Sequence, residues 1–238
     1  LGWRRTASRS VRLGARARAR RTAVSHAAPK LSIVVAAIPS LLSPAAGVPG
    51  DPARLAQRIV AGTVPVVVVG LLFNDFIEET LRTPAVAAGA LALGAALMFA
   101  AERLGTNRRA EDTVTWLDAV LIGCAQASAL IPGVSRSGAT ISLGLLLGLR
   151  RDAAARFTFL LAIPATLAAA GKESLELAHM GVSATNAQLM AVGVIVSALV
   201  GYITIKYFLR FLAGNRLDVF AYYRWALAAV TVVWLFRA

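Results

Sequence analysis

Long apolar runs without charge alternate with short charged segments along most of the chain. The stretches Pro84–Ala101 and Gln188–Ile205 each contain 18 residues and no charged side chain. A run of about that length can cross a hydrocarbon core as a helix, whereas a soluble helix would show a polar face every third or fourth residue. The pattern therefore predicts an all-α, polytopic membrane protein.

The same pattern predicts where the helices and loops lie. We expect helices at Ile59–Leu81, Pro84–Ala101, Trp116–Ile131, Ala139–Leu149, Phe157–Ala170, Gln188–Leu209 and Val219–Phe236, and loops at Glu102–Thr115, Arg150–Arg156 and Lys172–Ala187.

The two segments that flank Pro132–Gly138 are shorter than the roughly 20 residues of a full span. They predict a re-entrant helical hairpin. Non-helical backbone at membrane depth is tolerated where protein buries it or where it lines a water-filled cavity, so the turn also predicts a cavity.

Basic residues in the loops and at the helix ends are distributed unevenly. With the hairpin entering and leaving on one side, ten arginines fall on that side, against Arg82, Lys172 and Arg237 on the other. The positive-inside rule makes the arginine-rich side cytoplasmic. The hairpin tip is then expected to point away from the cytoplasm, although the charge count does not fix its depth.

The net charge of +13 changes this picture only at the beginning of the chain. Residues 1–30 hold eight arginines and one lysine without an acid. We expect a basic, irregular segment over residues 1–50, either a targeting segment or a disordered or mis-translated start, and a membrane-embedded domain over residues 51–238. Nucleic-acid binding is another interpretation of such a tail, but the rest of the sequence does not indicate a soluble nucleic-acid-binding domain.

The most polar part of the apolar region runs from Gln126 to Thr140. Arg136 stands out because a charged side chain inside a membrane segment is costly and usually marks a function. Its planar fork of donors suits phosphate oxygens. Further candidates are the hydroxyls of Ser135, Ser137 and Thr140, the close backbone approach allowed by Gly133 and Gly138, and a helix N-terminus near Gly138.

Together, these groups predict a phosphate-binding site. The alternative is structural: Arg136 would pair with an acid such as Asp118 or Glu79, and the serines would only cap a helix.

The chain resembles the undecaprenyl-diphosphatase family, which is also known for bacitracin resistance. The resemblance runs from about Leu55 to the C-terminus and is carried by Val64–Ile77, the signature PGVSRSGAT at Pro132–Thr140, Ala155–Pro164 and Phe220–Arg224. It implies hydrolysis of undecaprenyl diphosphate to undecaprenyl phosphate and inorganic phosphate, which recycles the lipid carrier for cell-wall synthesis. It also implies a fold with two re-entrant hairpins in an inverted repeat.

The resemblance further implies roles for individual residues. Arg136 would bind the diphosphate and stabilise transition-state charge, with Ser135 and Thr140 as its hydroxyl partners. Ser137, Gly133, Gly138 and Gln126 are the substrate-binding candidates. A divalent cation, Mg²⁺ or Ca²⁺, is expected, without assigned ligands. The expected surroundings are the bacterial inner membrane and a polyprenyl diphosphate, with a homodimer left open.

One family motif is not found in this sequence. The family carries a Glu-xxx-Glu stretch followed by a Ser/Thr-rich Gly-His element, but no acid precedes Asp51, and Ser25–His26 lies in the arginine-rich tail. We therefore expect this chain to hold only the second half-site and to work at no more than about a hundredth of a complete enzyme's rate.

Asp75, Glu78 and Glu79 could substitute for the missing acids, although solvated acids at a helix end are the favoured interpretation. A lipid-carrier transporter of the same architecture and an inactive fragment are the alternative functions.

Overall fold

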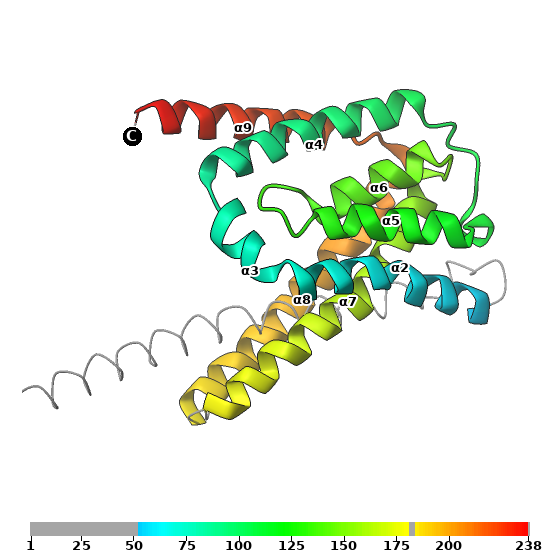
Figure 1. The fold of residues 1–238 in the computed structure, drawn as a ribbon. Helices are drawn as coiled ribbons and strands as arrows, with labels where there is room; N and C mark the ends of the chain where they lie inside the picture. The colour runs from blue at the N-terminus through cyan, green and yellow to red at the C-terminus, as the bar shows by residue number, and fades with distance from the viewer. Residues whose placement is uncertain (1–51, 181–183, 238) are drawn as a thin grey trace, which may run out of the picture. The chain divides into compact units, whose positions relative to one another are not determined.

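The computed structural model describes residues 52–180 and 184–237 (Figure 1). The segment 1–50 and the Ser25–His26 pair lie outside the described residues, so the predictions made for them stay predictions. The described elements are α2 (Pro52–Leu72), α3 (Asn74–Phe76), the π-helix η2 (Ile77–Leu81), α4 (Pro84–Leu104), the 3₁₀ turn η3 (Glu111–Thr113), α5 (Trp116–Ser128), α6 (Arg136–Leu146), α7 (Arg151–Met180), α8 (Ala184–Gly214) and α9 (Asp218–Arg237).

These residues form two compact units. One comprises residues 52–165 with 206–237, and the other residues 166–180 with 184–205. Helices α7 and α8 contribute to both units. Helices α4, α5, α6 and α9, which surround the candidate site, lie within the first unit.

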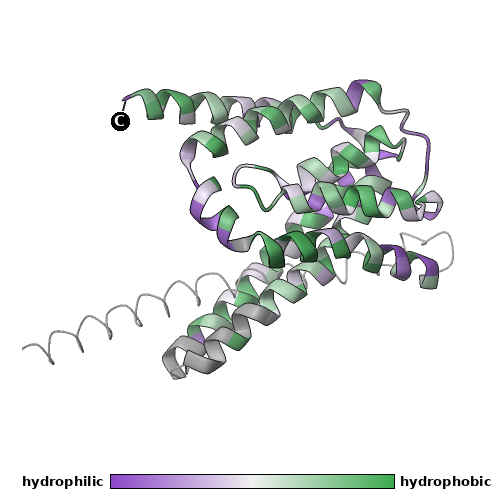
Figure 2. Ribbon diagram, in the orientation of Figure 1, coloured by the Kyte–Doolittle hydropathy of each residue, from purple (hydrophilic) through white to green (hydrophobic). Residues whose placement is uncertain are grey.

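Five of the described helices, α2, α4, α7, α8 and α9, are long and apolar enough to cross a membrane. Figure 2 shows hydrophobic residues along them and hydrophilic residues gathered at the start of α2, over α3 and η2, and in the loop after α4. The prediction of an all-α multi-pass membrane protein is confirmed. Helices α5 and α6, with 13 and 11 residues, are each shorter than the roughly 20 residues of a full span.

Local sequence signals set the ends of the helices around this hairpin. The Thr83 hydroxyl accepts a hydrogen bond from the Val86 amide, and Pro84 occupies the first turn of α4, where a missing N–H costs nothing. At the start of α5, Thr115 and Asp118 form a reciprocal capping box. Both helices therefore begin at residues that satisfy their free N–H groups.

Several predicted boundaries are wrong. The expected loop Lys172–Ala187 is largely helical, since α7 continues to Met180 and α8 begins at Ala184. The sequence KESLELAHM after Gly171 contains good helix formers and neither glycine nor proline, so the helix continues beyond its apolar part. In addition, α7 begins at Arg151 and α6 at Arg136, each earlier than predicted.

The first unit packs around α5 and α6. Helix α2 lies beside α5, α4 lies beside both α6 and α9, and α5 lies beside α6 (Figure 1). At Gly62 and Gly123 the backbones of α2 and α5 touch directly, because a Cβ added to Gly123 would collide with the Gly62 carbonyl. The core formed by these helices and the start of α7 includes Ile122, Ile141, Leu145, Phe157 and Leu161.

Buried ion pairs join the helix ends at the base of the hairpin. The Glu102 carboxylate lies 2.6 Å from Arg151 and 3.6 Å from Arg216, and it accepts a hydrogen bond from the Leu217 amide. Arg58 of α2 donates to the Asp112 carbonyl. These contacts place arginines from distant segments at one end of the bundle, as the charge pattern predicts.

Glu111, in the loop after α4, is a buried acid at the same end. Burial raises its pKa from 4.5 to about 7; Arg156, 3.7 Å away, opposes this rise, and Asp152 and Asp112 add to it. Among the described residues, its Oε1 has no hydrogen-bond partner. The carboxyl is therefore half ionised near neutral pH.

We expect Glu111→Gln to stabilise the fold increasingly as the pH rises. A carboxyl with a raised folded-state pKa stabilises the fold fully below its unfolded pKa, and this contribution is lost as the pH rises through about 7. Glutamine cannot ionise, so the melting temperature of the variant relative to wild type should increase between about pH 5 and about pH 8. Glu79→Gln, at an exposed position, is the control. A difference that is the same at both pH values would contradict the expectation.

Candidate active site

The signature begins with a tight turn between α5 and α6. Gly133 has a φ of 90°, and the Val134 amide donates to the Ile131 carbonyl at 3.1 Å. Proline followed by a glycine in the left-handed region is the pattern of a type II turn. The sequence Pro132–Gly133 therefore reverses the chain at the tip of the hairpin.

Helix α6 begins immediately after this turn. Ser135 is its N-cap, and the Ser135 hydroxyl accepts a hydrogen bond from the Gly138 amide at 3.1 Å. Arg136 is thus the first residue of the helix, whereas the sequence predicted a start near Gly138. The positive end of the helix dipole and the N–H groups of the first turn favour an anion at this position.

The side chains of the signature divide into an exposed and a buried group. Arg136 is exposed, while Ser135 and Ser137 are partly buried. Thr140 is completely buried, and its hydroxyl donates to the Arg136 carbonyl at 2.7 Å. The structure thus brings Arg136 and the two serines together at the helix start, and it gives Thr140 a contact within the helix.

The remaining candidates lie in α5, in the turn and at the start of α6. Gln126 of α5 is 1% exposed, and neither polar atom of its amide has a hydrogen-bond partner among the described residues. Gly133 packs on α4, since a Cβ there would lie 2.8 Å from the Ala87 Cα. Gly138 is buried and packs against Met98. A side chain at Gly133 would therefore meet the backbone of α4, whereas one at Gly138 would displace the flexible end of Met98.

Two such contacts give the depth of the hairpin along α4. At its base, a Cβ on Gly105 would lie 2.6 Å from the Leu145 carbonyl oxygen, and at its tip Gly133 meets Ala87. Ala87 and Gly105 are 18 residues apart, which corresponds to about 27 Å of helix. The tip therefore lies near the Pro84 end of α4, at the far end of the helix from the buried ion pairs.

Comparison with known proteins assigns the chain to a family. The family model "Bacitracin resistance protein BacA" matches residues 13–230, a longer stretch than the resemblance from about Leu55. The chain belongs to the BacA family.

Curated relatives agree with this assignment. The chain is similar to the undecaprenyl-diphosphatase of Rubrobacter xylanophilus, at 46% identity over 182 residues, which cover 76% of this chain and 67% of that protein. Undecaprenyl-diphosphatase 2 of Stutzerimonas stutzeri is 45% identical over 187 residues, or 77% and 68% of the two chains. The match to the undecaprenyl-diphosphatase of Mycolicibacterium vanbaalenii, at 43% identity, covers 65% of that protein. Each match thus spans about two thirds of the relative.

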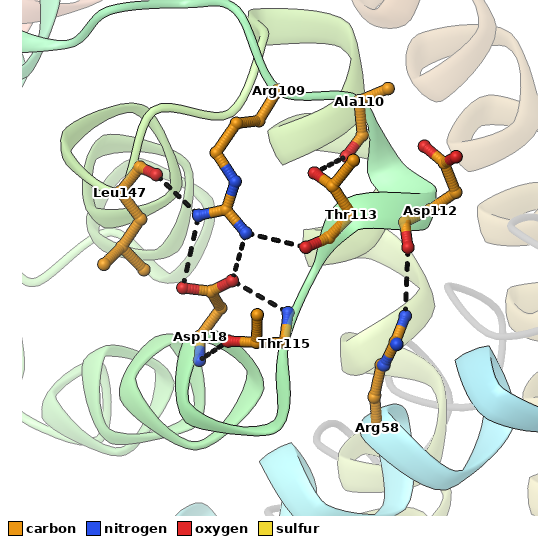
Figure 3. A network of polar contacts seen from close by, with 8 residues as sticks. All are labelled: Arg58, Arg109, Ala110, Asp112, Thr113, Thr115, Asp118 and Leu147. Atoms are coloured by element: carbon orange, nitrogen blue, oxygen red, sulfur yellow. Dashed lines mark hydrogen bonds and ion pairs between the residues drawn. The ribbon is translucent and has the colours of Figure 1, made fainter.

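In this BacA-family chain, Asp118 binds Arg109 at the base of the hairpin (Figure 3). Arg109 Nη2 lies 2.6 Å from Asp118 Oδ2 and also donates to the Thr113 carbonyl, while Nη1 donates to the Leu147 carbonyl. One guanidinium thereby joins the start of α5 to the end of α6. The alternative in which Asp118 pairs with Arg136 is wrong.

The acids considered as substitutes for the missing motif lie in α3 and η2. Asp75, Glu78 and Glu79 are exposed, and Glu78 pairs with Arg82 at 3.1 Å. Exposed acids at a helix end agree with the solvated interpretation favoured from the sequence.

The sequence does not predict that Arg224 lies beside the turn. Arg224 of α9 donates a hydrogen bond to the Gly133 carbonyl. Its only sequence signal was its place in the stretch Phe220–Arg224.

Proposed function

We propose that this chain hydrolyses undecaprenyl diphosphate to undecaprenyl phosphate and inorganic phosphate. The observation that carries the proposal is the exposed Arg136 in the first turn of α6, within the signature of a family whose curated relatives bear the name undecaprenyl-diphosphatase. The apolar helices around it suit a substrate whose long tail stays in lipid.

The residues of the turn supply electrostatic catalysis. The guanidinium of Arg136 can donate two parallel hydrogen bonds to phosphate oxygens. The start of α6 directs its dipole at the same place. Donors that are fixed before the reaction stabilise charge as it develops on the transferred phosphoryl group. The Ser135 hydroxyl accepts a hydrogen bond from the Gly138 amide and so stabilises the first turn of α6.

A divalent cation, Mg²⁺ or Ca²⁺, is part of the proposal through the family resemblance. Such an ion screens the charge of a diphosphate. Among the described residues, no group of three or more histidine, cysteine, aspartate or glutamate side chains is placed to hold a metal. We therefore assign no ligands to the ion and derive no step through it.

Phosphate release tests the proposal. The purified chain in detergent, supplied with undecaprenyl diphosphate and Mg²⁺ or Ca²⁺, should release inorganic phosphate above a protein-free blank. The same preparation in vesicles should not move the lipid phosphate between leaflets. Movement without release would instead support a transporter of the same architecture.

We also infer that the protein lies in the bacterial inner membrane and that the hairpin tip faces away from the cytoplasm. The arginine-rich base of the bundle supports this orientation under the positive-inside rule.

Cysteine labelling tests this orientation. In a background without Cys124, which is exposed, Arg108→Cys should react with an impermeant maleimide only from the cytoplasmic side. Glu79→Cys should react only from the opposite side. Both positions are exposed, so access to the reagent depends on the membrane side alone. Labelling of Arg108→Cys from outside would invert the assignment.

A further inference from the structure

Arg224 is a buried guanidinium beside the signature turn, and the proposed reaction does not use it. The residue is 7% exposed, on α9. Its Nη2 donates to the Gly133 carbonyl at 3.0 Å and to the Ala90 carbonyl at 3.2 Å. A single group thus connects three segments: α9, α4 and the hairpin tip.

Helix α4 is shaped to receive this guanidinium. A Cβ added to Gly94 would collide with Arg224 Nη2 and would lie 3.1 Å from its Cζ. Ala87, which underlies Gly133, and Ala90, which supplies the carbonyl, precede Gly94 by two turns and one turn respectively, so all three lie near one helix face. The small residues on this face therefore leave space for the Arg224 guanidinium to lie against α4 and reach the turn.

The charge of Arg224 has no acid to balance it in the described ranges, 52–180 and 184–237. No carboxylate there lies within ion-pair distance, and Arg224 Nε has no hydrogen-bond partner. Burying an unpaired charge destabilises a fold. An apolar side chain would fill the same space without burying a charge, so packing alone does not explain why a guanidinium is found here.

We propose that Arg224 is a positioning residue for the diphosphate site. By holding the Gly133 carbonyl against α4, it fixes the direction in which the chain leaves the turn and enters α6. Arg136 follows Gly133 by three residues, so the position of its guanidinium depends on that direction. This inference rests on the proposed function, because it assigns a task to Arg224 in placing Arg136 for the substrate.

Steady-state kinetics and melting temperatures of three variants test the proposal. Arg224→Met should lower kcat about 30-fold to 100-fold and change KM less than about threefold, because a displacement of about 1 Å can cost that much. Arg224→Lys should recover part of the rate, to within about tenfold of wild type, because an ammonium can bond one carbonyl but lacks the planar fork. Trp225→Phe is the matched control: it removes another bond from α9 to α4, from Trp225 Nε1 to the Ala92 carbonyl, without touching the turn.

A double-mutant cycle separates positioning from an independent contribution of charge. If Arg224 acts through Arg136, then Arg224→Met should cost less than about threefold in an Arg136→Lys background. An equal loss in both backgrounds would overturn the proposal, as would a folded Arg224→Met variant within threefold of Trp225→Phe. If Arg224→Met does not fold, Arg224→Lys decides. A loss of kcat of about fivefold to tenfold at unchanged KM supports the proposal, and a rate within about twofold of wild type overturns it.

Binding of inorganic diphosphate gives a readout that does not depend on hydrolysis. Diphosphate should raise the melting temperature of wild type and of Trp225→Phe, but not that of Arg136→Lys or Arg224→Met. If wild type releases no phosphate, the proposed function fails, and this pattern alone still decides the role of Arg224. A rise retained in Arg224→Met, or no rise in wild type, would overturn the inference.

Discussion

Arg136→Lys should lower the rate of phosphate release about a hundredfold or more and leave the fold intact. Lysine keeps the positive charge but presents one compact ammonium in place of a planar fork, so it cannot bond two phosphate oxygens in parallel. Loss of one fixed donor to a developing negative charge costs about 10² to 10³ in kcat. The side chain is exposed at the first position of α6, so the substitution leaves the core untouched.

The measurement is kcat in detergent together with the melting temperature. Arg82→Lys is the control, because Arg82 is also exposed and follows η2 outside the hairpin. That variant should keep its rate within about twofold of wild type. A similar rate for Arg136→Lys would show that the Arg136 guanidinium serves the structure and not the substrate.

Gly123→Ala should destabilise the protein by forcing two helix backbones apart. The added Cβ would collide with the Gly62 carbonyl oxygen and lie 2.8 Å from the Gly62 carbonyl carbon. Main-chain atoms within a helix cannot rotate aside as a side chain can, so α2 must move away from α5. Overpacking of this kind costs about 1–3 kcal/mol, occasionally more. The shift of α5 should also lower the phosphatase rate.

Gly89→Ala, in α4, is the matched control. Gly89 lies inside α4, and a methyl group added there would meet no atom within 4 Å. Alanine at this position should therefore be neutral or stabilising by about 0.5–1 kcal/mol. Melting temperatures of both variants in the same detergent provide the comparison. Equal melting temperatures would mean that the backbones of α2 and α5 separate readily in the folded protein.

Signals local to the chain were enough to predict the hairpin. Two short apolar runs around Pro132–Gly133 indicated it, because length against membrane thickness and the Pro-Gly turn are both properties of contiguous residues. The predicted start of α6 is too late because the apolar run begins at Ala139, whereas the helix begins directly after its cap Ser135, three residues earlier. The contact between Arg224 and Gly133 joins residues 91 positions apart. Such a contact depends on how α4 and α9 pack, and no local pattern contains it.

The depth of the hairpin tip determines which lipid molecules the enzyme can use. Because the tip meets α4 near Ala87, at the Pro84 end of the helix, the diphosphate would be held at the headgroup level of one leaflet. Carrier molecules in the opposite leaflet have their headgroups about one membrane thickness away, beyond the reach of Arg136. The protein would therefore deplete the diphosphate pool of a single leaflet, and recycling of the rest would proceed at the rate at which the carrier crosses the bilayer.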